Sequence, residues 1–240
     1  METRSYSFMS MKLGFTNSYL LKGSKGYVMI DTSYPSQYER FLRKLRKARI
    51  RISDISHLLL THHHDDHAGF ANRLLKKSEV KLIVHKNALP FLKKGQHHKK
   101  GEHLNWWVHS VISLFSGFLS HGYPSFNVRK DDIVLEDDNS ELLKDLGIDG
   151  KILYTPGHSI DSISVLLSNG DAFVGDAAMN FLNLSRIKYR PFFIQNIGDV
   201  FKSWNRLVEA GAKKIYPSHG KPFDSDKLKK NLGYENAHSI

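Results

Sequence analysis

The most informative stretch of this sequence is Thr61-His62-His63-His64-Asp65-Asp66-His67-Ala68-Gly69. It follows an apolar run at residues 55–60, which is typical of a buried strand. Where such a strand ends, the chain is still extended and its side chains alternate between two sides. We therefore expect His62 and His64 to point the same way, and His63 to point the opposite way.

Residues 68–69, at the end of this stretch, indicate a turn and the start of a helix. Asp66 and His67 come just before this turn and so belong to the same loop. Four metal-binding side chains can thus converge from one short loop: His62, His64, Asp66 and His67. Imidazole nitrogen and carboxylate oxygen are ligands that zinc accepts in catalytic sites, and manganese and iron occupy similar sites. A solvated polar loop is the alternative, but histidines that alternate correctly beside an apolar strand favour a metal site.

The same stretch resembles the His-x-His-x-Asp-His motif of the metallo-β-lactamase superfamily. The resemblance implies that more ligands follow downstream in a set order. Three candidates occur in that order: His158 after Gly157, Asp176 after Gly175, and His219 within residues 216–223. The resemblance therefore extends from about residue 17 to about residue 223.

The resemblance divides the candidate ligands between two metal ions. His62, His64 and His158 would hold one ion. Asp66, His67 and His219 would hold the other, and Asp176 would bridge the two. Asp31, at the end of a predicted strand, would support the loop of residues 61–69, called the metal loop below. Metal-bound imidazoles usually need an acceptor for their other nitrogen. An N-cap for the following helix is an equally open interpretation of Asp31.

The resemblance also implies an α/β fold, a four-layer αββα sandwich with the ligand loops along one edge of two packed sheets. Residues 1–240 would form a single domain, because a layered fold of this length is normally one domain. The local patterns agree with an α/β class. Strands are predicted at residues 6–9, 18–21, 27–30, 80–84, 126–136, 141–154, 162–167, 172–174 and, as the last strand, 214–216. Helices are predicted at residues 35–49, 68–77, 87–93 and 195–210.

Residues 94–127 interrupt this alternation and are predicted to form a helical insert that includes an almost uncharged segment at residues 104–119. That segment is long enough to suggest a membrane span. We reject a span because the segment contains Asn105, His109 and three serines, and because it lies between ligands that must meet in one site. A lid over the site, a buried helix or a dimer face, and a surface membrane helix remain open. His97, His98 and His103 are expected to be solvated.

The composition excludes several classes of site. The chain has 240 residues, with 40% hydrophobic and 25% charged residues, as in an ordinary globular protein. It has no cysteine, so disulfides, thiolate metal sites and a cysteine nucleophile are excluded. The first residues do not read as a signal peptide, and a cytoplasmic location is expected. The net charge of +11 permits nucleic acid, anionic lipid or an acidic substrate as a partner.

Two neighbouring cations would lower the pKa of a shared water from ~15.7 towards ~7 and polarise the substrate oxygen. No side-chain nucleophile is then needed, and Asp66 could orient the hydroxide or give a proton to the leaving group. Zinc suits the nitrogen-rich ligands, with iron or manganese as alternatives. We therefore expect a dinuclear hydrolase acting on a small ester, thioester or lactone, with an apolar or anionic small molecule as substrate.

Two other interpretations remain open. A phosphodiesterase or nuclease of the same superfamily is favoured by the positive charge. A basic nucleic-acid-binding protein with a non-catalytic metal site belongs to another class, and a complete ligand set argues against it. Within the esterase interpretation, Asp176 argues against the classical zinc β-lactamases, which lack a bridging carboxylate. Met179 stands where many related lactonases place a tyrosine, which weakens a lactone as the substrate. The oligomeric state is left open.

Overall fold

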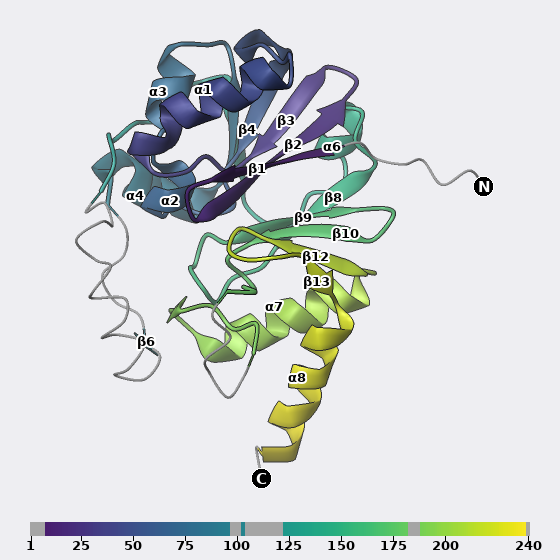
Figure 1. The fold of residues 1–240 in the computed structure, drawn as a ribbon. Coiled ribbons are helices and arrows are strands. Elements are labelled where there is room, and N and C mark those ends of the chain that lie inside the picture. Colours follow the sequence, from purple (N-terminus) through teal and green to yellow (C-terminus); the bar gives the residue numbers. More distant parts are fainter. Residues whose placement is uncertain (1–7, 97–101, 104–121, 182–187, 239–240) are drawn as a thin grey trace.

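The computed structural model describes residues 8–96, 102–103, 122–181 and 188–238. Two sheets pack face to face, and helices cover the outer side of each sheet (Figure 1). The predicted α/β class and four-layer αββα sandwich are therefore confirmed.

The first sheet has the strand order β1-β2-β3-β4-β5-β7. Its strands are β1 (Phe8–Leu13), β2 (Thr16–Gly23), β3 (Gly26–Ile30), β4 (Ile55–Leu59), β5 (Lys81–His85) and β7 (Ile133–Leu135). The first three form antiparallel hairpins, whereas β3, β4, β5 and β7 run parallel. The carboxyl ends of the parallel strands consequently lie at one edge of the sheet, and the metal loop begins there, directly after β4.

Helices α1 (Tyr38–Lys47), α2 (Asp65–Ala68), α3 (Ala71–Lys76) and α4 (Leu89–Lys94) lie on the outer side of the first sheet (Figure 1). Short 3₁₀ turns at Pro35–Gln37, Ile52–Asp54 and Lys86–Ala88 connect these elements to their neighbours. Helix α1 forms because Tyr38, Phe41 and Leu45 recur at helical spacing and are buried against the sheet. Its basic residues cover the outer face.

The second sheet has the order β13-β12-β10-β9-β8. Its strands are β8 (Gly150–Tyr154), β9 (Ile163–Leu167), β10 (Asp171–Gly175), β12 (Lys214–Pro217) and β13 (Phe223–Asp224). Helices α7 (Ile197–Glu209) and α8 (Asp226–His238) lie on its outer side (Figure 1). A two-stranded pair joins β6 (Glu102–His103) to β11 (Phe193–Ile194).

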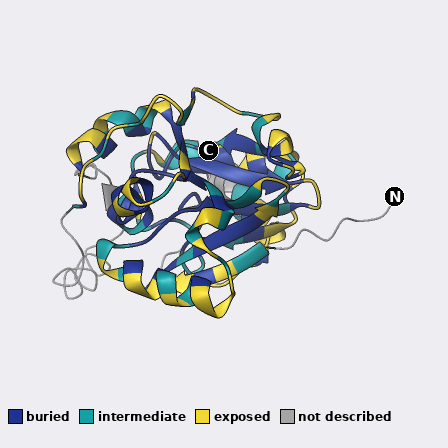
Figure 2. Ribbon diagram, turned by 90° about the horizontal axis from the view of Figure 1, so that it is seen from above, coloured by how far each residue is buried: buried dark blue, intermediate teal, exposed yellow. Residues whose placement is uncertain are grey.

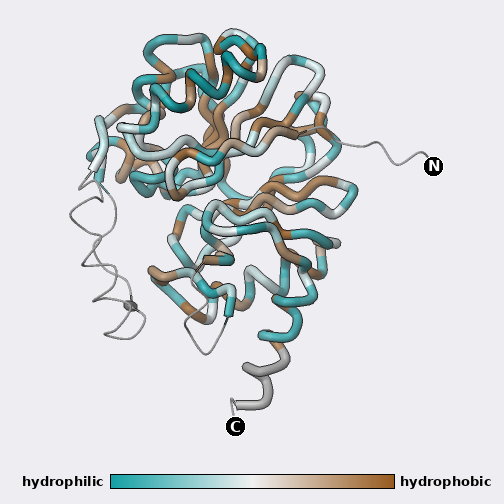
Figure 3. The backbone as a smooth tube through the Cα atoms, viewed as in Figure 1, coloured by the Kyte–Doolittle hydropathy of each residue, from teal (hydrophilic) through white to brown (hydrophobic). Residues whose placement is uncertain are grey.

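Three apolar cores separate the four layers. The first, between α1, α3 and the first sheet, includes Phe41 and Leu74. The second, between the two sheets, includes Phe173, and the third, between the second sheet and α7, includes Trp204 and Leu207. Figure 2 shows buried strands enclosed by helices with exposed outer faces. Figure 3 shows that hydrophobic residues are concentrated where the layers meet.

Several sequence predictions differ from the structure. Residues 141–154 were expected to be strand, but α6 (Leu142–Asp145) precedes β8. The Asn139 side chain accepts hydrogen bonds from the backbone N–H groups of Glu141 and Leu142 and so starts a helical turn, and Leu143 is buried in the core between the sheets. Residues 126–132 do not form a strand, and β12 is followed by β13 and α8, which the sequence patterns did not indicate.

Most of the predicted insert at residues 94–127 lies outside the described residues, since residues 97–101 and 104–121 are not among them. The same holds for His97 and His98, and nothing is described of the side chain of His103. The helical insert and the solvated histidines therefore stay predictions. Among the helices of the described ranges, none is long and apolar enough to cross a membrane.

The core between the sheets gives a stability prediction. Phe173 is fully buried, and its ring lies 4.8–5.0 Å from the rings of Phe8, Tyr19 and Tyr216. Replacing it with alanine should lower the free energy of unfolding by about 3–5 kcal/mol, because the two packed sheets can relax only partly into the cavity that is left. The exposed Phe15 is the control, and Phe15→Ala should change stability by no more than about 0.5 kcal/mol. Guanidinium unfolding followed by circular dichroism measures both; equal effects would contradict the layered packing.

Candidate metal centre

The metal loop leaves the carboxyl end of β4, and its first residues alternate as expected. His62 Nε2 lies 3.1 Å from His64 Nδ1, so these two rings meet on one side of the loop. His63 points away, and its Nδ1 lies 2.8 Å from Asp161 Oδ1. His64 is still extended, with φ −63° and ψ 156°, and α2 begins at the next residue, which brings Asp66 and His67 back towards the same side.

The remaining candidate ligands come from the second sheet. His158 follows β8, Asp176 directly follows β10, and His219 follows β12. Strand β10, which ends at Gly175 directly before Asp176, passes very close to the metal loop. Gly175 has φ +54°, and a Cβ atom there would lie 2.4 Å from Thr61 Oγ1, so only glycine allows this approach.

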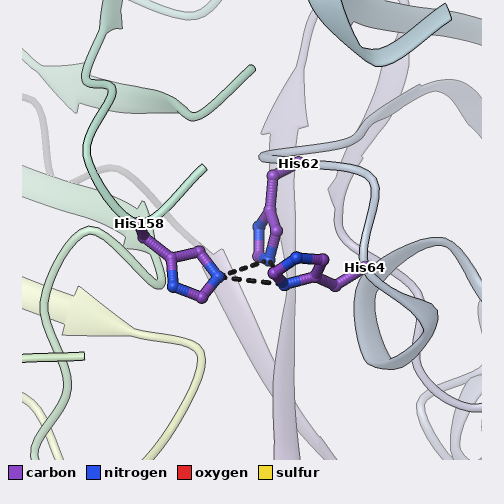
Figure 4. Close-up of side chains that lie close together, drawn as sticks. All are labelled: His62, His64 and His158. Atoms are coloured by element: carbon purple, nitrogen blue, oxygen red, sulfur yellow. Dashed lines mark hydrogen bonds between the residues drawn. The ribbon is translucent and has the colours of Figure 1, made fainter. Parts of the chain in front are cut away.

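The seven predicted ligands converge in two adjoining groups. His62, His64 and His158 form the first group, in which His158 Nε2 lies 3.1 Å from His62 Nε2 and 3.0 Å from His64 Nδ1. Figure 4 shows the three rings, two from the metal loop and one from the loop after β8, pointing at a common centre. Nitrogen ligands about 2.0–2.1 Å from one tetrahedral zinc ion stand roughly 3.3 Å apart, so this spacing fits a metal ion.

The second group consists of Asp66, His67, Asp176 and His219. His219 Nε2 lies 2.9 Å from Asp66 Oδ2, and Asp176 Oδ1 lies 3.5 Å from Nε2 of both His67 and His219. The other oxygen of Asp176, Oδ2, lies 3.7 Å from His158 Nε2 in the first group. Asp176 therefore stands between the two groups.

The hydrogen bonds around the first group leave its nitrogen lone pairs facing one another. Thr61 Oγ1 donates its single proton to Asp31 Oδ2 at 2.7 Å, so it accepts a hydrogen bond from His62 Nδ1 at 3.1 Å. His158 Nδ1 donates to the Phe193 carbonyl at 2.7 Å. The Nε2 atoms of neutral His62 and His158 are then both unprotonated and only 3.1 Å apart. Two such lone pairs repel each other, and a cation between them removes the repulsion.

In the described part of the chain, the second group also has ligand atoms that face one another and lack a hydrogen-bond partner. His67 Nδ1 donates to Asp31 Oδ2 at 2.8 Å, and His219 Nδ1 donates to the Phe15 carbonyl at 3.1 Å. Within the described ranges, His67 Nε2 and Asp176 Oδ1 are buried and have no hydrogen-bond partner. Buried polar atoms are rarely left in this state, and a bound metal ion is an ordinary explanation. The residues present therefore fit two metal ions.

The Asp31 carboxylate holds the metal loop in place through several hydrogen bonds. Its carboxylate accepts hydrogen bonds from the backbone N–H of Thr61 at 2.7 Å, from the Thr61 hydroxyl and from His67 Nδ1. The chain at Asp31 is in the left-handed region, with φ +56°. The alternative role as an N-cap is wrong, because the next 3₁₀ turn begins at Pro35 and its N-cap position is Tyr34.

The sequence patterns did not reveal the acceptors for His158 and His219. Both are backbone carbonyls, those of Phe193 and Phe15, and a carbonyl carries no residue-type signature. Thr61 was part of the quoted stretch, but its role between Asp31 and His62 depends on hydrogen bonds that only the fold creates.

Burial and neighbouring charges shift histidine pKa values in the two groups in opposite directions. Burial lowers the pKa of His62 well below its usual value, and burial also lowers the pKa of His158. Burial opposes the charged form of His67 too, but Asp66, Asp31 and Asp176 outweigh it and raise its pKa well above the usual value. The same balance, with Asp176 and Asp66 as the raising charges, brings the pKa of His219 to about 9.

These shifts predict how the metal-free protein responds to pH. Because the pKa of His219 is about 9 when folded and roughly 6.5 when unfolded, its contribution to stability is complete below pH 6.5 and is lost as the pH rises towards 9. His67 acts in the same direction. The melting temperature of chelator-treated protein should therefore fall over this range, and zinc loading should flatten the dependence.

Zinc binding at pH 7 should also displace the protons of His67 and His219. Titration of weakly buffered metal-free protein with zinc, in the presence of a pH indicator, measures this release. Zinc uptake with no proton release would contradict the assignment of the two histidines.

The support from Asp31 predicts an effect on metal affinity. Asparagine tolerates the left-handed conformation, so Asp31→Asn should fold. It should weaken metal binding about 10–100-fold, because the amide cannot orient Thr61 and His67 as the carboxylate does. Competition with a chromophoric chelator measures the affinity. Asp54→Asn, at a partly exposed carboxylate bound to Arg51 and outside the centre, is the control and should bind metal like the wild type. Equal affinities of all three proteins would refute the supporting role.

Curated relatives are similar over most of this chain. The metallo-beta-lactamase fold-containing protein ST1585 of Sulfurisphaera tokodaii is 28% identical over 203 residues, which are 84% of this chain and 71% of that protein. The probable metallo-hydrolase MJ0888 of Methanocaldococcus jannaschii is 26% identical, with 85% and 87% covered. Other relatives are longer: the chain spans 57% of the beta-lactamase-like protein 2 homolog of Caenorhabditis elegans and about half of fungal lactamase-like proteins, 51% for adaB of Aspergillus niger.

Solved structures share the fold. The archaeal metallo-beta-lactamase superfamily protein ST1585 superposes with a TM-score of 0.66 at 22% identity, covering 98% of this chain and 88% of that structure. The metallo-beta-lactamase family protein TTHA1429 of Thermus thermophilus also gives 0.66, at 20% identity, covering 96% and 79%. The family model described as metallo-beta-lactamase superfamily matches residues 11–219, a range that holds every candidate ligand from His62 to His219. On this match the chain belongs to the metallo-beta-lactamase superfamily.

Proposed function

We propose that this protein is a hydrolase that uses two divalent metal ions, with zinc as the first candidate, to cleave a small ester, thioester or lactone. The observation that carries the proposal is the position of Asp176 between two groups of donors, with one oxygen towards His158 and the other towards His67 and His219. The name probable metallo-hydrolase, borne by relatives from Bacillus subtilis and Methanocaldococcus jannaschii, supports the same class of reaction.

In the proposed centre, His62, His64 and His158 hold one ion, and Asp66, His67 and His219 hold the other. When bound, two such ions supply a water that ionises near neutral pH and a positive charge that polarises a carbonyl oxygen. The chain supplies the orientation. Asp31, Thr61 and the carbonyls of Phe15 and Phe193 fix which nitrogen faces the centre in four of the ligand histidines: His62, His67, His158 and His219.

Asp66 is the proposed proton-handling residue. Its side chain is 14% exposed, more than the 4% of Asp176, so it can reach both the centre and an entering substrate. Its Oδ2 atom is held by His219 at 2.9 Å. We assign to it the orientation of the attacking water or the return of a proton to the leaving group.

Aromatic side chains beside the centre support an apolar substrate. Phe15 is 61% exposed and Phe181 is 38% exposed, and their rings lie 6.4 Å apart. The ring of Phe192 lies 6.0 Å from that of Phe181. This row begins at the residue whose carbonyl binds His219 and ends one residue before Phe193, whose carbonyl binds His158. An uncharged acyl group can pack on such rings, whereas the charged phosphate group of a phosphodiester cannot.

The basic outer face of α1 keeps the phosphodiesterase or nuclease as the second candidate. Its exposed basic residues are Arg40, Arg43, Arg46, Lys47 and, just beyond the helix, Arg49. Nucleic-acid binding without chemistry remains the alternative of another class, in which that face would act alone. The cytoplasmic location and the single-domain organisation remain predictions from the sequence, and the oligomeric state is left open.

A substrate panel tests the proposal. Zinc-loaded protein should hydrolyse nitrophenyl acyl esters or lactones faster than bis-nitrophenyl phosphate, a chelator should abolish the activity, and added zinc should restore it. Asp66→Ala should lower kcat by about a hundredfold or more, because it removes both a ligand and the proton-handling group. Asp224→Ala, at an exposed carboxylate of β13, should keep wild-type turnover. Faster phosphodiester cleavage would favour the second candidate, and no metal-dependent turnover of any substrate would refute an enzyme of this kind.

A further inference from the structure

The three-histidine group is assembled from two loops that belong to different sheets. His62 and His64 come from the loop after β4 in the first sheet, and His158 comes from the loop after β8 in the second. Their donor atoms must stay roughly 3.3 Å apart for one zinc ion to bind, and the observed distances of 3.0 and 3.1 Å are close to this value. Because sheets that pack through apolar side chains can slide slightly, a directional contact between these two loops would set that distance.

His63 and Asp161 make such a contact. His63 lies between the two ligands His62 and His64, and Asp161 lies three residues after His158. His63 Nδ1 is 2.8 Å from Asp161 Oδ1, and both side chains are fully buried. The pair therefore joins the two loops at points next to all three ligands, on the side of the metal loop that faces away from the centre.

Other contacts hold His63 in one orientation. Its ring stacks on Phe91 of α4 at 4.0 Å between centroids and 14° between planes. Its carbonyl accepts a hydrogen bond from the Tyr123 hydroxyl at 2.7 Å. With its ring stacked and its backbone held, His63 can transmit the position of Asp161 to its two neighbours in the chain.

Stability alone is a poor explanation for this pair. Taking a carboxylate and an imidazole out of water costs free energy, and well-packed apolar residues of the same volume are often as stabilising or more so. The other oxygen of Asp161, Oδ2, is buried and has no hydrogen-bond partner within the described parts of the chain, which adds to the cost. A directional bond, unlike apolar packing, fixes both distance and angle.

The second group of ligands is anchored independently of the pair. The His67 carbonyl accepts hydrogen bonds from the backbone N–H of Thr32 at 2.7 Å and from the Thr32 hydroxyl at 2.6 Å. The His67 ring is held by Asp31, and Ser218, beside His219, also donates to Asp31 at 3.2 Å. Loss of the His63–Asp161 contact should therefore leave this half in place.

We infer that His63 and Asp161 are positioning residues that set the metal affinity of the His62–His64–His158 group and have little effect on the other group. This inference rests on the proposed two-metal centre. Neither residue contacts substrate in this scheme, and both act through the ligands beside them.

The inference is tested by measuring zinc affinity in two variants, each of which keeps only one of the two ligand groups intact. In a His219→Ala background the three-histidine group is the stronger remaining site, and in a His158→Ala background the second group is. Adding His63→Phe, which keeps the stacked ring but loses the hydrogen bond, should weaken zinc binding about tenfold or more in the first background and less than about threefold in the second. His63→Asn, whose amide can still donate to Asp161, should recover most of the loss.

The matched control is His57→Phe, at a buried histidine of β4 outside the centre, which should change neither affinity. Asp161→Leu, which removes the acceptor of the same hydrogen bond at similar volume, serves if His63→Phe does not fold. Melting temperatures report folding throughout. Equal weakening in both backgrounds, or none in either, would overturn the inference. A wild-type protein that binds fewer than two zinc ions would instead refute the proposed function, so the two failures are distinguishable.

Discussion

The buried carboxylate of Asp31 is the contact on which the rest of the centre depends. It accepts hydrogen bonds from the metal loop through Thr61, from the ring of His67 and from Ser218 at the end of β12. One side chain thus joins the first sheet, the start of α2 and the second sheet. The left-handed conformation at Asp31 directs the chain away after β3, and the energy of that conformation is offset by the hydrogen bonds that the carboxylate receives.

The centre beside Asp31 contains several ionisable side chains that are largely shielded from water. The ligand side chains are largely buried, and histidines with lowered pKa values lie beside histidines with raised ones. Without metal, protons on His67 and His219 balance the carboxylates of Asp66 and Asp176. In the proposed two-metal centre, cations would replace those protons, and the hydrogen bonds on the outer nitrogens of His62, His67, His158 and His219 would not need to change.

Much of the fold followed from local patterns, and the errors occurred where such patterns are ambiguous. Alternation along an extended chain correctly separated His63 from its neighbours, since the period of a strand depends only on the backbone. Residues 142–145 were misread as strand because a short apolar run fits a buried strand and a buried helical turn equally well. The final strand and helix, β13 and α8, gave no clear periodic signal, because packing against α7 and β12 holds them in place.

Composition and spacing are enough to establish the donor chemistry: with no cysteine, histidine and carboxylate are the expected ligands, and the spacing around His62 to His67 brings four donors to one loop. Only the folded chain establishes which nitrogen of His62, His67, His158 and His219 faces the centre and which distant groups hold these rings. Hydrogen-bond acceptors such as the Phe193 carbonyl, and partners such as Asp161 for His63, lie 35 and 98 residues away from the groups they bind. No local pattern records such pairs, because they form only when the two sheets pack together.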